Sequence, residues 1–131
     1  MVTDPIGDML AQIRNAGAVH KSTIVLPYSK LRYAVATALV KYGYIESVAK
    51  KGKKVVKTME IGLLYTADGK HRISGADRLS KPSRRMYFAV TDIKPIRHGY
   101  GTLVLSTPTG ILSGNEARKI KVGGEALFKI W

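Results

Sequence analysis

Small groups that can form hydrogen bonds but carry no charge gather at two turns in the last third of the chain. The first turn is Ser106-Thr107-Pro108-Thr109-Gly110, which follows an apolar run typical of a strand. The second is Gly123-Gly124, which follows a short run of helical character. Such groups suit close contact with the shallow groove of an A-form RNA helix, because that groove displays 2′-hydroxyls. By themselves, the two turns are better explained as the end of a strand and the end of a helix.

Clustered cations form a second kind of candidate site. One cluster is on an expected hairpin and contains Lys50, Lys51, Lys53, Lys54 and Lys57. The other recurs through the start of the second half and contains Lys70, Arg72, Arg78, Lys81, Arg84 and Arg85. Lysines suit phosphate contacts that add affinity without sequence information, and arginine can also fork onto a phosphate or stack on a base. The lysine turn is explained equally well as a solvated turn that discourages aggregation at a sheet edge.

Catalytic and metal-binding patterns are missing from the sequence. The three histidines, His20, His71 and His98, are isolated, and the chain has no cysteine. No histidine spacing typical of a zinc site occurs, no pair of neighbouring acids suggests acid and base chemistry, and no phosphate-binding glycine loop is present. We therefore predict that the chain is not an enzyme, and that it has no metal, no cofactor and no small-molecule substrate.

The charge balance points to a polyanionic partner. Lysine and arginine together number 22 against 9 acids, so 131 residues carry a formal net charge of +13. This density favours nucleic acid over a merely soluble basic protein. A membrane is less suitable, because the cations are spread over loops and strands and no window approaches the roughly 20 apolar residues of a spanning helix. A hydrophobic fraction of 45% predicts a folded chain, and the lack of cysteine fits a reducing compartment.

The first half of the sequence predicts the element order α-β-α-β-β. Apolar residues at helical spacing follow Asp4-Pro5 up to about Gly17, and a short strand is expected over 23–26. Ser29 is a suitable cap for a second helix that ends at Gly43. Two strands are expected over 44–49 and 55–65, joined by a cationic turn over 50–54.

The second half predicts mainly strands with short helices. Strands are expected over 71–79, 85–90, 101–107 and 125–131, with a helical turn over 92–96. Ser113-Gly114-Asn115-Glu116 matches a capping box, so a helix is expected over about 114–121. In the final strand, Ala126, Phe128 and Ile130 alternate with Glu125, Leu127 and Lys129, and we expect Trp131 to be packed.

Turn residues over 66–70 mark the best candidate boundary between the halves. We therefore predict an α+β protein of two small packed modules, an N-terminal α-β-α-β-β module over 1–66 and a C-terminal β-rich RNA-binding module over 67–131.

The ordered set of motifs resembles the family of the eighth protein of the small ribosomal subunit, over essentially all 131 residues. The C-terminal motifs that carry the resemblance are the 106–110 loop, Glu116-Ala117-Arg118-Lys119 and Val122-Gly123-Gly124-Glu125. The N-terminal ones are Thr3-Asp4-Pro5-Ile6-Gly7-Asp8-Met9-Leu10 and Ile13-Arg14-Asn15-Ala16. Comparable turns fall at Ser80-Lys81-Pro82 and Gly99-Tyr100-Gly101.

The resemblance implies two RNA-facing surfaces. The implied C-terminal residues are Ser106, Thr107, Pro108, Thr109, Gly110, Gly123, Gly124, Glu125 and Tyr87, and the basic cluster adds Lys81, Arg84 and Arg85. The implied N-terminal residues are Thr3, Asp4, Pro5, Arg14, Asn15, Ser29 and Lys30, and the hairpin adds Lys50, Lys51, Lys53, Lys54 and Lys57. One departure matters, because Pro108 stands where the family usually has serine and so removes a hydroxyl and an N–H donor.

The resemblance also implies a function. It is that of a structural constituent of the small ribosomal subunit, which binds directly to the central domain of its ribosomal RNA and supports assembly and translation. The implied partners are this RNA and neighbouring ribosomal proteins, in the cytoplasm or, as an alternative left open, in an organellar ribosome. The alternative function is feedback regulation by binding its own operon messenger RNA with the same surface.

Overall fold

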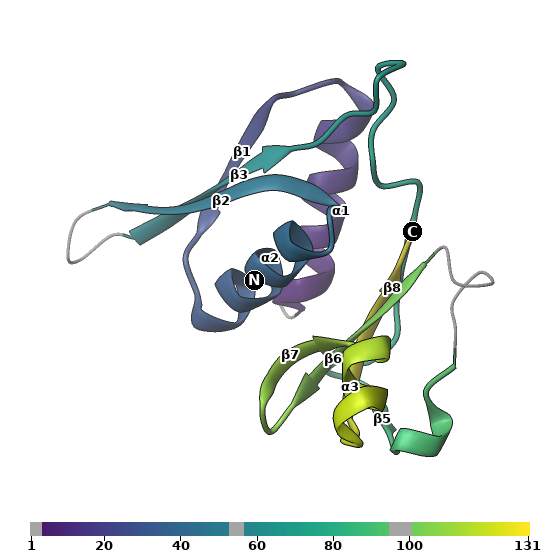
Figure 1. Ribbon diagram of the computed structural model, residues 1–131. Coiled ribbons are helices and arrows are strands. Elements are labelled where there is room, and N and C mark those ends of the chain that lie inside the picture. Colours follow the sequence, from purple (N-terminus) through teal and green to yellow (C-terminus); the bar gives the residue numbers. More distant parts are fainter. Residues whose placement is uncertain (1–3, 53–56, 95–100) are drawn as a thin grey trace. The chain divides into compact units, whose positions relative to one another are not determined.

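A computed structural model describes residues 4–52, 57–94 and 101–131 of the chain (Figure 1). Contacts divide them into two compact units, Pro5–Ile73 and a second unit of Asp4 with Ser74–Trp131. This division does not decide where a folding domain ends, so the boundary predicted between residues 66 and 67 stays a prediction.

The first unit contains two helices and a three-stranded antiparallel sheet. Its elements in chain order are α1 (Pro5–Ala18), β1 (Thr23–Pro27), α2 (Lys30–Lys41), β2 (Ile45–Gly52) and β3 (Lys57–Leu63). The strands are arranged β1-β3-β2, so that β3 is central and pairs with both neighbours. The predicted order α-β-α-β-β is therefore confirmed for this unit.

The sequence explains both helices. In α1, Ile6, Met9 and Ile13 are buried at helical spacing, and Pro5 takes the first position. At the start of α2, the Ser29 hydroxyl accepts a hydrogen bond from the Arg32 amide at 3.1 Å, which confirms Ser29 as the cap.

The cationic turn predicted over 50–54 is wrong in its first three residues. Lys50, Lys51 and Gly52 belong to β2, where they pair with Met59, Thr58 and Lys57 of β3. Lysine has a low β-propensity, but pairing with β3 outweighs that preference here. The remaining residues of the predicted turn, Lys53 and Lys54, lie outside the described residues.

The second unit contains one antiparallel sheet with two short helices. Its elements are β4 (Ala76–Arg78), β5 (Tyr87–Phe88), the 3-10 helix η1 (Val90–Asp92), β6 (Thr102–Thr107), β7 (Gly110–Ser113), α3 (Gly114–Ile120) and β8 (Gly124–Ile130). The strand order is β4-β8-β6-β7, and β5 also pairs with β8. Together with the first unit, this confirms the predicted α+β class.

Several boundaries in the second unit differ from the prediction. The strand expected over 71–79 is reduced to β4. A helical turn was expected over 92–96, and η1 overlaps this range only at Asp92. Pro95 and Ile96, like Gly99 and Tyr100, lie outside the described residues. Strand β7 was missed, because the sequence of Ile111-Leu112-Ser113 is too short to show an alternating pattern.

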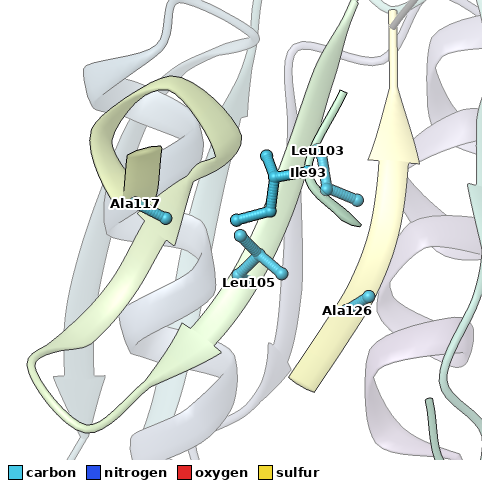
Figure 2. Packing of buried hydrophobic residues seen from close by; sticks show 5 residues of the cluster. All are labelled: Ile93, Leu103, Leu105, Ala117 and Ala126. Atoms are coloured by element: carbon cyan, nitrogen blue, oxygen red, sulfur yellow. The ribbon is translucent and has the colours of Figure 1, made fainter. Parts of the chain in front are cut away.

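An apolar cluster lies between the sheet and α3. It consists of Ile93, Leu103, Leu105, Ala117 and Ala126, from four different segments (Figure 2). Helix α3 is capped by Ser113, whose hydroxyl accepts a hydrogen bond from the Glu116 amide at 3.2 Å while the Glu116 carboxylate accepts one from the Ser113 amide at 3.1 Å. The predicted capping box is confirmed, and it directs Ala117 into the cluster.

A β-bulge interrupts the predicted alternation in β8. Val104 pairs with Phe128 but the next residue, Leu105, pairs with Ala126, so Leu127 is an extra residue. Paired side chains share a face, and Val104 and Leu105 point to opposite faces. Ala126 and Phe128 therefore lie on opposite faces, and the prediction that they share one is wrong.

The Trp131 backbone closes against Gly75. The Gly75 amide donates to the Trp131 carbonyl at 3.1 Å, and the Trp131 amide donates to the Gly75 carbonyl at 3.0 Å. The indole also contacts Gly75, where a Cβ atom would lie 2.7 Å from the ring. The expectation that Trp131 is packed is confirmed.

Candidate nucleic-acid interface

The turn between β6 and β7 is held together by the Thr107 hydroxyl. This hydroxyl donates to the Gly110 carbonyl at 2.7 Å and accepts from the Thr109 amide at 3.3 Å, and the two threonine hydroxyls lie 3.0 Å apart. Ser106 and Thr107 belong to β6, so the predicted five-residue loop is reduced to an exposed tip of Pro108 and Thr109 with Gly110. The tip presents a hydroxyl from Thr109 beside the position where Pro108 lacks one.

The glycine pair at the start of β8 is required by neighbouring backbone. A Cβ atom on Gly123 would lie 2.3 Å from the Phe88 carbonyl oxygen, and one on Gly124 would lie 2.2 Å from the Ser106 carbonyl oxygen. Only glycine allows these approaches. The predicted helix stop is made instead by Lys121, which has a left-handed φ of 58°.

Three candidate residues meet in one row across the sheet. Glu125 of β8 pairs with Tyr87 of β5 on one side and with Ser106 of β6 on the other. Their side chains share a face, which is opposite to the face that carries Leu105 and the apolar cluster. Tyr87 is 69% exposed, although its neighbour Phe88 packs against the cluster. The row thus combines an exposed ring, a carboxylate and a hydroxyl.

The Glu125 carboxylate is held by two donors. The Ser80 hydroxyl and the Arg85 guanidinium, the latter at 3.0 Å, both donate to its Oε2 atom. Burial opposes ionisation, but the hydrogen bonds from Ser80 and Arg85 and the charges of Arg85 and Arg78 outweigh it, so the pKa of Glu125 lies below its ordinary value. The group is an anion that accepts hydrogen bonds at neutral pH.

Residues 81–85 form a basic loop that is extruded from the segment paired with β8. The Ser80 amide donates to the Ala126 carbonyl and the Ala126 amide donates to the Met86 carbonyl, both at 2.9 Å. Residues 81–85 therefore leave the strand and return to the same partner. Lys81 and Arg84 exchange two backbone hydrogen bonds of 2.9 and 3.0 Å within this loop. Lys81, Arg84 and Arg85 are all exposed, so the structure brings these predicted residues together beside the row.

Arg78 has a structural contact that the sequence did not predict. Its side chain is only 12% exposed, its Nη2 atom lies 3.0 Å from Asp4 Oδ1, and its Nη1 atom donates to the Leu127 carbonyl. Asp4, a predicted RNA-binding residue, is thereby engaged by a guanidinium of the same unit. Because the partners are 74 positions apart in the sequence, there is no local signal for this pair.

The N-terminal candidate residues that follow Asp4 in the chain lie on the first unit. Pro5, Arg14 and Asn15 are exposed on α1, and Lys30 is exposed at the start of α2, beside the capping Ser29. Asn15 also borders an open hollow, which is lined as well by Gln12, Ala16, Val19, Lys21 and Ile24. Thr3 lies outside the described residues.

The described lysines of the hairpin have different surroundings. Lys50 Nζ lies 4.6 Å from the centre of the Tyr28 ring, and Lys51 Nζ lies 2.6 Å from Glu60 Oε2. Lys57 is exposed at the start of β3. Lys50 and Lys51 are thus held on strand β2, and both residues are exposed.

The described residues fall in the ranges 4–52, 57–94 and 101–131. No group of three or more potential ligands from His, Asp and Glu that could hold a metal ion occurs within these ranges. In the same ranges, no helix has the length and apolar character needed to cross a membrane.

Comparison with known proteins decides the family. Residues 4–131 match the sequence model of the family described as ribosomal protein S8. The chain belongs to the ribosomal protein S8 family. Among its relatives, a protein of Nitratidesulfovibrio vulgaris (strain DSM 19637 / Miyazaki F) named small ribosomal subunit protein uS8 is 48% identical, and one of Persephonella marina with the same name is 45% identical. Both matches cover 100% of this chain and of the relative.

Membership of the ribosomal protein S8 family confirms the resemblance seen in the sequence motifs. It also confirms the prediction of a structural, ribonucleoprotein component and not an enzyme. The residues that ribosomal protein S8 uses toward RNA in this chain stay predictions, and the geometry above shows which of them can act together.

Proposed function

We propose that this protein is a constituent of the small ribosomal subunit that binds directly to the central domain of its ribosomal RNA and supports subunit assembly and translation. The observation that carries the proposal is the row of Tyr87, Glu125 and Ser106 beside the extruded basic loop. Family membership over residues 4–131 and the net charge of +13 support it.

The proposed mechanism separates affinity from specificity. Exposed cations of the 81–85 loop and of the β2–β3 hairpin neutralise phosphates, which contributes affinity to any RNA. The exposed tip of the β6–β7 turn and the hydroxyl of Ser106 approach the ribose-lined groove, where small groups fit. Tyr87 offers a ring on which an unstacked base can stack, and Glu125 accepts hydrogen bonds from base or ribose. These roles fix the register of the protein on one RNA helix.

The proposed partners follow from this mechanism. They are the small-subunit ribosomal RNA and neighbouring proteins of the same subunit, and the proposed place of action is the ribosome.

A filter-binding experiment tests the proposal. The protein is titrated with a transcript of the central domain of small-subunit ribosomal RNA and with a scrambled transcript of equal length and composition. We expect the central-domain transcript to bind at least about a hundredfold more tightly at physiological salt. Several phosphate contacts predict that both affinities fall by roughly 10³-fold or more between 50 and 200 mM salt. Equal affinity for the two transcripts would contradict the proposal.

The alternative, binding of the protein's own operon messenger RNA, uses the same surface. It is separated by competition, in which unlabelled messenger fragments displace the labelled central-domain transcript. Displacement at concentrations similar to those of unlabelled ribosomal RNA supports the regulatory role, and displacement only at the level of scrambled RNA argues against it.

A further inference from the structure

Ser80 is a completely buried polar residue beside the candidate interface. Its exposed fraction is 0%, yet it is not part of the apolar cluster. Its hydroxyl donates to Oε2 of Glu125 and accepts from the Met86 amide at 3.1 Å. A buried hydroxyl with both capacities used is a fixed geometric element, because moving it would leave buried groups without partners.

Ser80 lies at the base of the basic loop, directly before Lys81. Ser80 and Met86 are the two residues at the base of the extruded loop, and both bond to the backbone of Ala126. The side-chain bond between Ser80 Oγ and the Met86 amide therefore closes the neck of the loop. The cations of Lys81, Arg84 and Arg85 project from a base whose width is fixed by one hydroxyl.

The Ser80 hydroxyl also fixes the position of the Glu125 carboxylate, which binds Arg85, the last residue of the loop. Ser80 and Arg85 donate to the same oxygen of Glu125, and Glu125 lies in the row with Tyr87 and Ser106. The Glu125 side chain is 19% exposed and that of Arg85 is 52% exposed, so the ion pair joins a partly buried carboxylate to an accessible cation. Ser80 thus connects the basic loop to the row of candidate readers.

We propose that Ser80 is a positioning residue for RNA specificity, which holds Glu125 and the basic loop 81–85 at one fixed spacing without itself contacting RNA. This inference rests on the proposed function and names a residue within its mechanism. With the spacing fixed, the loop's cations meet phosphates only when the row faces the matching part of the RNA. A flexible loop would contact the phosphates of any RNA equally well.

The test compares Ser80→Ala with Ser113→Ala in the whole protein. Ser113 is a suitable control because it is a second buried serine of the same unit, with an exposed fraction of 7%, and its hydroxyl caps α3. Both variants lose one buried hydroxyl, so urea unfolding identifies any difference in stability. We expect Ser80→Ala to lower the affinity for the central-domain transcript on the order of tenfold, and that for scrambled RNA about twofold or less.

Two further readouts separate positioning from a general loss of structure. In free protein, the pKa of the Glu125 carboxyl, followed by carbon NMR, rises in Ser80→Ala and does not change in Ser113→Ala, because only the first removes a donor. In a double-mutant cycle, the losses caused by Ser80→Ala and Arg85→Gln are expected to be less than additive, since both act in part through the same carboxylate.

The outcomes distinguish the inference from the function on which it rests. If Ser80→Ala and Ser113→Ala reduce the preference for the central-domain transcript equally, the inference is overturned and the proposed function stands. Additive losses in the cycle with Arg85→Gln also overturn it. If the unaltered protein shows no preference between the transcripts, the proposed function fails, and the inference with it.

Discussion

The α-carbon of Gly124 faces the carbonyl oxygen of Ser106 so closely that a Cβ atom would lie 2.2 Å from it. Two strands that carry candidate RNA-binding groups thus touch through their backbones. The glycine is required by the protein itself, whatever it contributes to RNA binding, and a substitution at Gly124 acts on the fold first.

Gly124→Ala is expected to destabilise the protein by about 1–3 kcal/mol, because the added methyl meets backbone that cannot rotate away. Urea unfolding without RNA measures this. Gly69→Ala is a suitable control, since Gly69 has a positive φ of 83° but open space around its α-carbon, so only backbone strain of about 1–2 kcal/mol is added. Unchanged stability of Gly124→Ala would show that β6 and β8 do not approach each other in this way.

Thr107→Val is expected to lower stability by about 1 kcal/mol, because it removes the hydroxyl that bonds to the Gly110 carbonyl while keeping the shape of the side chain. Because its turn is looser, the variant is also expected to bind the central-domain transcript more weakly than the unaltered protein does, with a smaller effect on scrambled RNA. Thr107→Ser keeps the hydroxyl and is expected to retain both properties. Equal behaviour of the two variants in unfolding and filter-binding experiments would refute this.

Removing the charges of Lys50 and Lys51 is expected to lower the affinity for cognate RNA and for scrambled RNA by the same factor, since phosphate contacts carry no sequence information. The double variant Lys50→Gln/Lys51→Gln lowers the slope of log affinity against log salt by about 1 for each lysine that contacts a phosphate. Glu60→Gln is the control, because it removes the partner of Lys51 but keeps both cations. A loss confined to the cognate RNA would assign these lysines to recognition.

His71 is expected to make the first unit less stable as the pH falls below 6.5. Burial, together with the positive charge of His20, lowers the pKa of His71 from its ordinary value of 6.5. The folded chain therefore binds fewer protons than the unfolded chain, and its stability is complete above pH 6.5 and decreases below it.

The surroundings of His71 explain this shift. The ring packs on Gly17 and lies 5.6 Å from the Tyr65 ring, which in turn stacks on His20 at 5.7 Å. The His71 Nε2 atom is buried and has no hydrogen-bond partner among the residues that the structure describes. Urea unfolding at pH 7.5 and 5.5 should show a smaller difference for His71→Gln than for the unaltered protein. Parallel pH dependence in the two proteins would rule out His71 as the cause.

The helices and their caps could be predicted because their signals are local. The apolar spacing from Ile6 to Ile13, the serine before α2 and the capping box before α3 each lie within a few residues. Strand ends were less predictable, since Lys50 and Lys51 join β2 only through pairing with β3.

The candidate site combines local and distant relationships. The tip at Pro108 and Thr109 was visible as a turn, whereas the bond from Ser80 to Glu125 joins residues 45 apart and the pair of Asp4 and Arg78 spans 74. Side chains that meet only through a shared strand partner leave no periodic signal in one sequence. For the same reason Ser80, which looked like an ordinary turn residue, could not be singled out.

The extra residue at Leu127 decides where the negative charge of β8 goes. If β8 alternated without interruption from Ile130, Glu125 would share the side of Lys129 and Leu103 and would point at the methyl groups beneath α3. Deleting Leu127 would remove the bulge and leave a regular ladder, in which Ala126 still pairs with Leu105 and Glu125 still pairs with Ser106. Because the bulge takes up Leu127 outside the alternation, Ala126 stays in the cluster and Glu125 stays on the opposite face of the same short strand.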